Sequence, residues 1–166
     1  MMVHCGDADG YLGGIAHHYP DIVKPCLQTI GPDPSAHRIV GLYMMTVNGQ
    51  LMFIADATIN IYPDARTLAE IALQTARVAR RFGVTPKVAM LSFSNFGTSN
   101  ELRTDRIEEA ITMAREMDRG LVIDGPMQAD TALVPDRQKE FPFMEFEGPA
   151  NVLVCPNLES ENIAVS

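Results

Sequence analysis

Short apolar runs alternate with longer amphipathic stretches along most of this chain, and this alternation restricts the fold more than any other feature. Runs of the length of a buried strand lie at Lys87–Leu91, 121–123 and 151–155. Apolar residues at helical spacing occupy 63–82, before the first run, and 103–117, between the first two. Strands and helices in alternation form right-handed crossovers, so the sequence predicts a parallel sheet between layers of helices.

An Asn48-Gly49 pair separates two apolar, β-branched and aromatic runs at 38–47 and 50–55. Both central residues of a type I′ turn need a positive φ, which makes Asn-Gly the strongest short hairpin signal. The sequence therefore predicts a mixed, mostly parallel α/β sheet with one antiparallel hairpin. Further helices are predicted at 21–30, with Asp21 as the cap, at 128–133, and from Pro156 onward.

Size and composition limit the kinds of protein that this chain can be. Its 166 residues suffice for one packed domain, and 46% hydrophobic with 20% charged residues is ordinary for a globular protein. A net charge of −8 without a basic block argues against nucleic acid and anionic membrane surfaces. Three widely spaced cysteines indicate reduced thiols, and no apolar run reaches membrane-spanning length. We therefore expect a cytoplasmic protein.

Polar turns follow three of the predicted parallel strands, at 92–99, 124–130 and 156–162. The carboxyl ends of parallel strands meet at one edge of a sheet, where such folds bind ligands. Small hydroxyl residues and glycine after a buried strand place backbone N–H groups at a helix start, which suits an anionic or carbonyl-bearing ligand. The same residue types also simply turn the chain and cap a helix. The candidate ligand-binding residues of these turns are Ser92, Ser94, Asn95, Gly97, Thr98, Ser99, Asp124, Gln128, Asp130 and Asn157.

Residue patterns for catalysis are weak in this sequence. Asp124 and Asp130 form a carboxylate pair near the predicted edge, which serves acid-base chemistry only if burial separates the two pKa values. The alternative is that Asp130 anchors the turn by hydrogen bonds. The nucleophilic-serine, Walker and dinucleotide-binding motifs are absent, and no metal ligands are assigned.

Several ordered motifs resemble the phosphate acetyl/butyryl transferase (phosphotransacetylase) family. The resemblance is closer to the phosphotransacetylase-like C-terminal region of bacterial NADP-dependent malic enzymes, because SNFG stands where free-standing transacetylases tend to have a lysine-glycine pair after Ser-Thr. The motifs, which span nearly the whole chain, are GDADGYLGG, FIADATIN, PDARTLAEIA, VAMLSFSNFGTS, IDGPMQADTAL and ANVLVCPNLESENIA.

This resemblance implies a lobe like those of isocitrate and isopropylmalate dehydrogenases, acyl-CoA or acyl phosphate as the ligand, and homodimers or higher homo-oligomers. It further implies that a CoA thiolate attacks an acyl-phosphate carbonyl, that arginines hold the phosphate and that a late aspartate takes the thiol proton. In the malic-enzyme branch, acetyl-CoA or CoA is the ligand here, while NADP and a divalent metal belong only to the parent enzyme's other domain.

Two departures from the family pattern bear on activity. Lys24 stands where the family's phosphate-binding arginine is expected, and lysine keeps the charge but loses the bidentate fork. The serine-arginine pair and aspartate base of the active enzymes lie beyond the last matched motif. We therefore expect a single lobe, truncated at both ends relative to the family, without catalytic residues of its own.

Three functional hypotheses follow from the resemblance. The first is a regulatory acyl-CoA-binding domain of an NADP-dependent malic enzyme. The alternative is a catalytically active phosphate acetyltransferase that transfers acetyl between CoA and phosphate. The third is an oligomerisation module with a vestigial ligand edge.

Overall fold

The computed structural model describes residues 1–14, 16–32, 39–56, 62–97, 102–158 and 160. The chain divides into two compact units, Met1–Ile39 and Val40–Ser166. Among the described residues, no helix combines the length and the apolar character that crossing a membrane requires.

The first unit contains two helices, α1 (Met2–Cys5) and α2 (Tyr19–Thr29). The sequence pattern did not predict α1, and α2 starts two residues earlier than expected. The predicted cap is wrong: His18 is the N-cap residue, while Asp21 lies in the first turn, where its charge favours the helix dipole. No described side chain of this unit is fully buried.

The second unit is built on a five-stranded sheet, with the order β1-β2-β5-β3-β4 among the described residues. The β1–β2 pair is antiparallel, whereas β2, β5, β3 and β4 run parallel to one another. This topology confirms the predicted mixed, mostly parallel sheet. The strands are β1 (Gly41–Val47), β2 (Gln50–Asp56), β3 (Lys87–Leu91), β4 (Val122–Met127) and β5 (Val152–Val154).

The hairpin between β1 and β2 turns at Asn48 and Gly49, as predicted. Their φ angles of 51° and 78° are both positive, as a type I′ turn requires. Val47 pairs with Gln50 across the turn, so the loop has two residues.

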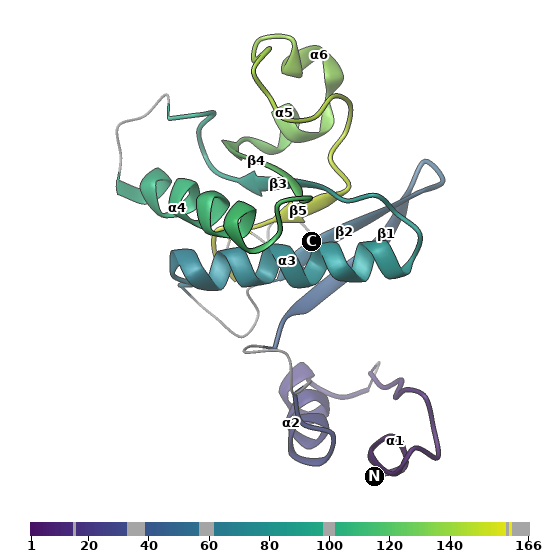
Figure 1. The fold of residues 1–166 in the computed structure, drawn as a ribbon. Coiled ribbons are helices and arrows are strands. Elements are labelled where there is room, and N and C mark those ends of the chain that lie inside the picture. The colour runs from purple at the N-terminus through teal and green to yellow at the C-terminus, as the bar shows by residue number, and fades with distance from the viewer. Residues whose placement is uncertain (15, 33–38, 57–61, 98–101, 159, 161–166) are drawn as a thin grey trace. The chain divides into compact units, whose positions relative to one another are not determined.

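Helices α3 (Ala65–Arg81) and α4 (Leu102–Met117) cover one face of the sheet (Figure 1). Helix α3 begins where the Asp64 carboxylate accepts a hydrogen bond from the Thr67 amide at 2.8 Å. Its apolar stripe, spaced three and four residues apart, packs on alternate side chains of β3, Val88 and Met90. The buried members of the stripe are Leu68, Ile71, Ala72, Ala76 and Ala79.

The opposite face of the sheet carries α5 (Ala129–Leu133), α6 (Pro135–Gln138) and the segment that leads to β5 (Figure 1). Here Ala89 and Leu91 of β3 pack with Ala132, Phe146 and other buried apolar residues. Since β3 side chains alternate between the two cores, the strand is buried on both faces, as its unbroken apolar run predicted.

The turn predicted at Asp124-Gly125-Pro126 is wrong, because β4 continues through these residues to Met127. Asp124 pairs with Ala89, and Met127 pairs with Leu91, so β4 accommodates one extra residue between the two pairs. A bulge of this kind absorbs a proline, which has no N–H to donate to the ladder.

An ion pair joins the C-terminal ends of α3 and α4. Arg80 Nη1 donates to Asp118 Oδ2 at 2.9 Å, and the Gly120 amide donates to Asp118 Oδ1 at 3.0 Å. The Arg80 hydrogen bond, helped by that of Gly120 and opposed by desolvation, holds the pKa of Asp118 below its ordinary value.

A lowered folded-state pKa means that the stabilisation is present above the unfolded pKa of about 3.9 and is lost as the pH falls through the folded value. We expect Asp118→Asn to lower the free energy of unfolding by about 0.5–1 kcal/mol at neutral pH, because the pair is partly exposed. The free energies of unfolding of the unchanged protein and of Asp118→Asn, measured by urea titration, should converge as the pH falls below about 4. A difference that persists undiminished at low pH would contradict this assignment.

Candidate functional site at the carboxyl edge of the sheet

The polar segments after β3, β4 and β5 lie at one edge of the sheet, because these three strands are parallel neighbours. The segments are Ser92–Gly97 after β3, Gln128 after β4 and 155–157 after β5. We call this the carboxyl edge. The three segments share one edge, as the alternation of strands and helices predicted, and ligand binding at this edge stays a prediction.

Two amide side chains connect the loop after β3 to the end of β4. Asn95 Nδ2 donates to Gln128 Oε1 at 3.0 Å, and the Gln128 backbone amide donates to Asn95 Oδ1 at 2.8 Å. Gln128 Nε2 also donates to the Phe93 carbonyl at 2.9 Å. These three bonds form the Asn95–Gln128 bridge, which fixes two of the predicted site segments to each other.

Backbone hydrogen bonds hold the same loop against β4. The Ser92 amide donates to the Met127 carbonyl at 2.8 Å, and the Phe96 amide donates to the Pro126 carbonyl at 2.7 Å. Phe96 and Gly97 then take positive φ angles of 44° and 73°, which turns the chain away from the strand. Ser94 is buried inside this loop, and Ser92 and Asn95 are half-buried.

The segment after β5 is tied to α4 by an arginine that sequence reasoning missed. Arg106 Nη2 donates to the Pro156 carbonyl at 3.1 Å. Its Nε is buried and has no hydrogen-bond partner among the described residues. Asn157 Oδ1 accepts hydrogen bonds from the amide and the hydroxyl of Ser160, both at 2.8 Å. The one sequence signal for this contact is that Arg106 directly precedes Ile107, which is buried against the sheet.

The two predicted carboxylates have separate structural partners. Asp124, within β4, accepts from the Gly125 amide with Oδ1 and from the Glu145 amide with Oδ2, both at 2.9 Å. Asp130 Oδ1 accepts from the Thr131 amide at 2.9 Å, and Oδ2 lies 3.6 Å from Arg137 Nε. These bonds favour the interpretation that Asp130 anchors its turn over paired acid-base chemistry, and they give Asp124 a structural role as well.

The three remaining candidates are not among the described residues of the second unit. Lys24 is exposed on α2 and belongs to the first unit. Thr98 and Ser99 lie outside the described residues. In the described part of the chain, no three His, Cys, Asp or Glu side chains gather as a metal site would require.

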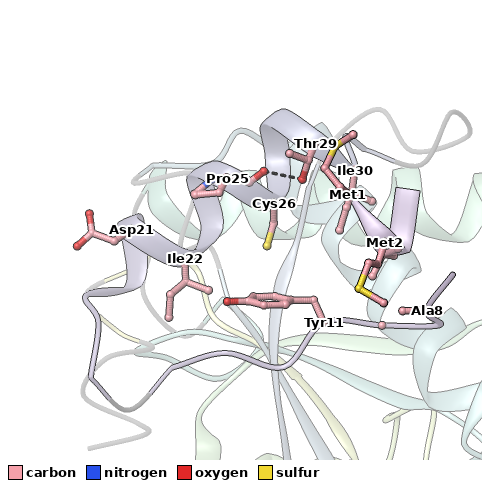
Figure 2. A pocket seen from close by; sticks show the side chains of 12 residues that line it. Met1, Met2, Ala8, Tyr11, Asp21, Ile22, Pro25, Cys26, Thr29 and Ile30 are labelled. Carbon is pink, nitrogen blue, oxygen red and sulfur yellow. Dashed lines mark hydrogen bonds between the residues drawn. The ribbon is translucent and has the colours of Figure 1, made fainter. Parts of the chain in front are cut away.

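The first unit has a mostly apolar pocket of about 420 Å³ between α1, α2 and the segment that connects them. Figure 2 shows the Tyr11 ring beneath α2, with the side chains of Ile22 and Cys26 directed toward it. Thr29 donates its hydroxyl proton to the Pro25 carbonyl at 2.8 Å on the same helix. Lys24 does not line the pocket.

The phosphate acetyl/butaryl transferase family model matches residues 1–166, which is the whole chain. The chain belongs to this family. The predicted resemblance to the phosphotransacetylase family is therefore confirmed.

Curated relatives in this family carry the name of the acetyltransferase. The phosphate acetyltransferase of Bacillus subtilis is 40% identical over 164 residues, covering 98% of this chain and 51% of the relative. That of Corynebacterium glutamicum is 38% identical over 164 residues, covering 98% and 50%. The chain thus spans about half the length of the curated relatives it matches.

Solved structures give the same result for the fold. The EutD phosphotransacetylase from Staphylococcus aureus superposes with a TM-score of 0.86 at 38% identity, over 99% of this chain and 51% of that one. A phosphotransacetylase from Streptococcus pyogenes gives a TM-score of 0.87, also at 38% identity and over 99% and 51%.

Proposed function

We propose that this chain forms part of a phosphate acetyltransferase, an enzyme that transfers an acetyl group between CoA and inorganic phosphate. The observation that carries this proposal is the identity of about 40% to proteins of that name along 98% of the chain. The carboxyl edge supports it, because polar loops of the kind that bind phosphate and carbonyl groups are fixed there by the Asn95–Gln128 bridge.

In this reaction the CoA thiolate forms a bond to the acetyl carbonyl carbon, the carbonyl–phosphate oxygen bond breaks and phosphate departs. The thiol proton must pass to a base before or during attack. We propose that the residues of this chain bind and position the substrates, and we assign the proton transfer to none of them. The loop Ser92–Gly97, with Gln128 and Asn157, would hold the acyl phosphate or thioester against its partner, where orientation lowers the barrier most.

The malic-enzyme interpretation ranks second. It rests on the SNFG motif and on Lys24 in place of an arginine, whereas the relatives reported above are named for acetyl transfer. NADP and a divalent metal would belong to that second interpretation alone. We also propose a cytoplasmic location and a homodimer or higher homo-oligomer. Three widely spaced cysteines that form no disulfide in the described part of the chain support the location.

The direct test is an assay of the polypeptide that carries this chain, supplied with acetyl phosphate and CoA. We expect one thiol to disappear and one phosphate to be released for each thioester formed. Binding of acetyl-CoA without turnover, together with malate-dependent reduction of NADP, would contradict the transferase and favour the regulatory domain.

A further inference from the structure

Three phenylalanine rings pack together beside the loop that follows β3. The Phe96 ring centroid lies 4.9 Å from that of Phe143 and 5.1 Å from that of Phe141, and Phe141 and Phe143 are 6.1 Å apart. The Phe96–Phe143 and Phe141–Phe143 pairs are edge-to-face. We call these three residues the aromatic cluster.

The backbone at Phe96 places its ring in the cluster at an energetic cost. Its φ of 44° lies in the left-handed region, which a bulky side chain rarely adopts. The bond from its amide to the Pro126 carbonyl holds that conformation. Strained residues of this type concentrate at ligand sites, where the surrounding structure fixes a side chain for use.

The cluster is open to solvent on its outer side. Phe143 is 64% exposed, Phe93 on the same loop is 52% exposed, and Phe96 and Phe141 are half-buried. Phe96 directly follows Asn95, so the same loop carries both a ring of the aromatic cluster and an amide group of the Asn95–Gln128 bridge. This combination fits a ligand that carries a flat aromatic ring and a polar arm.

We propose that the aromatic cluster stacks the adenine ring of CoA, with Phe143 as the principal contact. The proposal rests on the proposed function, which makes CoA a substrate at this edge of the sheet. Adenine offers a flat face to an exposed ring, and its polar chain would extend from the cluster toward the bridge. Phe143 acts in ligand binding and takes no part in the chemical step.

The test compares CoA with pantetheine, which carries the thiol arm but lacks the adenine nucleotide. Calorimetric titrations of the polypeptide that carries the chain should give about tenfold weaker CoA binding in Phe143→Leu, which keeps apolar volume but removes the ring. Pantetheine binding should be unchanged in that variant. Phe143→Trp should keep the affinity for CoA, because it restores an aromatic face.

Phe82→Leu is the matched control. Phe82 directly follows α3 and is 53% exposed. Its ring centroid lies 6.0 Å from that of Phe53, and Phe82 is not part of the aromatic cluster. This variant should bind both probes as the unchanged protein does.

The adenine site would be overturned if Phe143→Leu weakened the binding of CoA and of pantetheine equally, or if it left CoA binding unchanged. Acetyl transfer by the unchanged protein would still uphold the proposed function in either case. A dimer that dissociates in Phe143→Leu with unaltered CoA affinity would instead identify the cluster as an interface between copies, and would also overturn the site. Absence of both CoA binding and acetyl transfer in the unchanged protein would refute the proposed function and the adenine site together.

Discussion

Replacing Gly125 with alanine is expected to lower the free energy of unfolding by about 3 kcal/mol, because both strain and overpacking act at this site. Gly125 has a φ of 138°, and a Cβ there would lie 2.6 Å from the Met90 carbonyl oxygen and 3.1 Å from Met90 Cβ. Met90 belongs to β3 and is buried between β4, β5 and the helices, so its backbone has nowhere to move. Thermal and urea unfolding of the purified variant measure the loss.

Gly120→Ala provides the matched control for this prediction. Gly120 has no left-handed φ, and an added Cβ would meet only Asp118 Oδ1, at the ordinary contact distance of 3.5 Å. Its stability should stay within about 0.5 kcal/mol of the unchanged protein or rise slightly. Equal melting temperatures for the Gly125 and Gly120 variants would show that β4 does not approach β3 as closely as the structure has it.

Gln128→Ala is expected to slow acetyl transfer by about tenfold to a hundredfold, since a small misplacement of a binding loop is costly in rate. The substitution removes the side-chain bonds from Asn95 Nδ2 and to the Phe93 carbonyl, both of which hold the loop after β3. The fold should lose no more than about 2 kcal/mol, because the broken bonds are exposed. Steady-state kinetics at saturating CoA and a melting curve together separate these two effects.

Gln50→Ala is the control for Gln128→Ala, because it removes the same side chain from an exposed position at the start of β2, at the opposite edge of the sheet. It should leave the rate unchanged. A double-mutant cycle of Asn95→Ala with Gln128→Ala should show coupling, since the two side chains share a bond. Additive losses would show that the bridge is not a functional unit.

Local sequence patterns predicted the elements that local chemistry determines. Asn48-Gly49 fixed the hairpin because its φ requirements are intrinsic to the turn. The apolar run from Val88 to Leu91 predicted β3, whose bounds are Lys87–Leu91, since burial on both faces leaves no polar position within that run. The stripe from Leu68 to Ala79 predicted α3 for the same kind of reason.

Elements determined by tertiary contacts were not predictable in this way. Gly125-Pro126 has the composition of a turn, yet pairing with β3 extends the strand through it, and the Glu145 amide satisfies the Asp124 carboxylate from another segment. The Asn95–Gln128 bridge joins residues 33 positions apart, and Arg106 reaches a carbonyl 50 positions away. The sequence predicted which segments share the carboxyl edge of the sheet, but not which of their side chains form hydrogen bonds with each other.

If this chain takes part in acetyl transfer, the carboxyl edge is the surface that binds CoA and acetyl phosphate. Amide NMR spectra of the isotope-labelled polypeptide during a CoA titration test this location of the site, because each backbone N–H group gives its own signal. We predict chemical-shift changes at Ser94, Asn95, Gly97 and Gln128, with Lys87 and Asn151 at the amino ends of the strands unchanged. Shifts confined to the amino ends of the strands, in a protein that catalyses acetyl transfer, would show that CoA does not bind at the carboxyl edge.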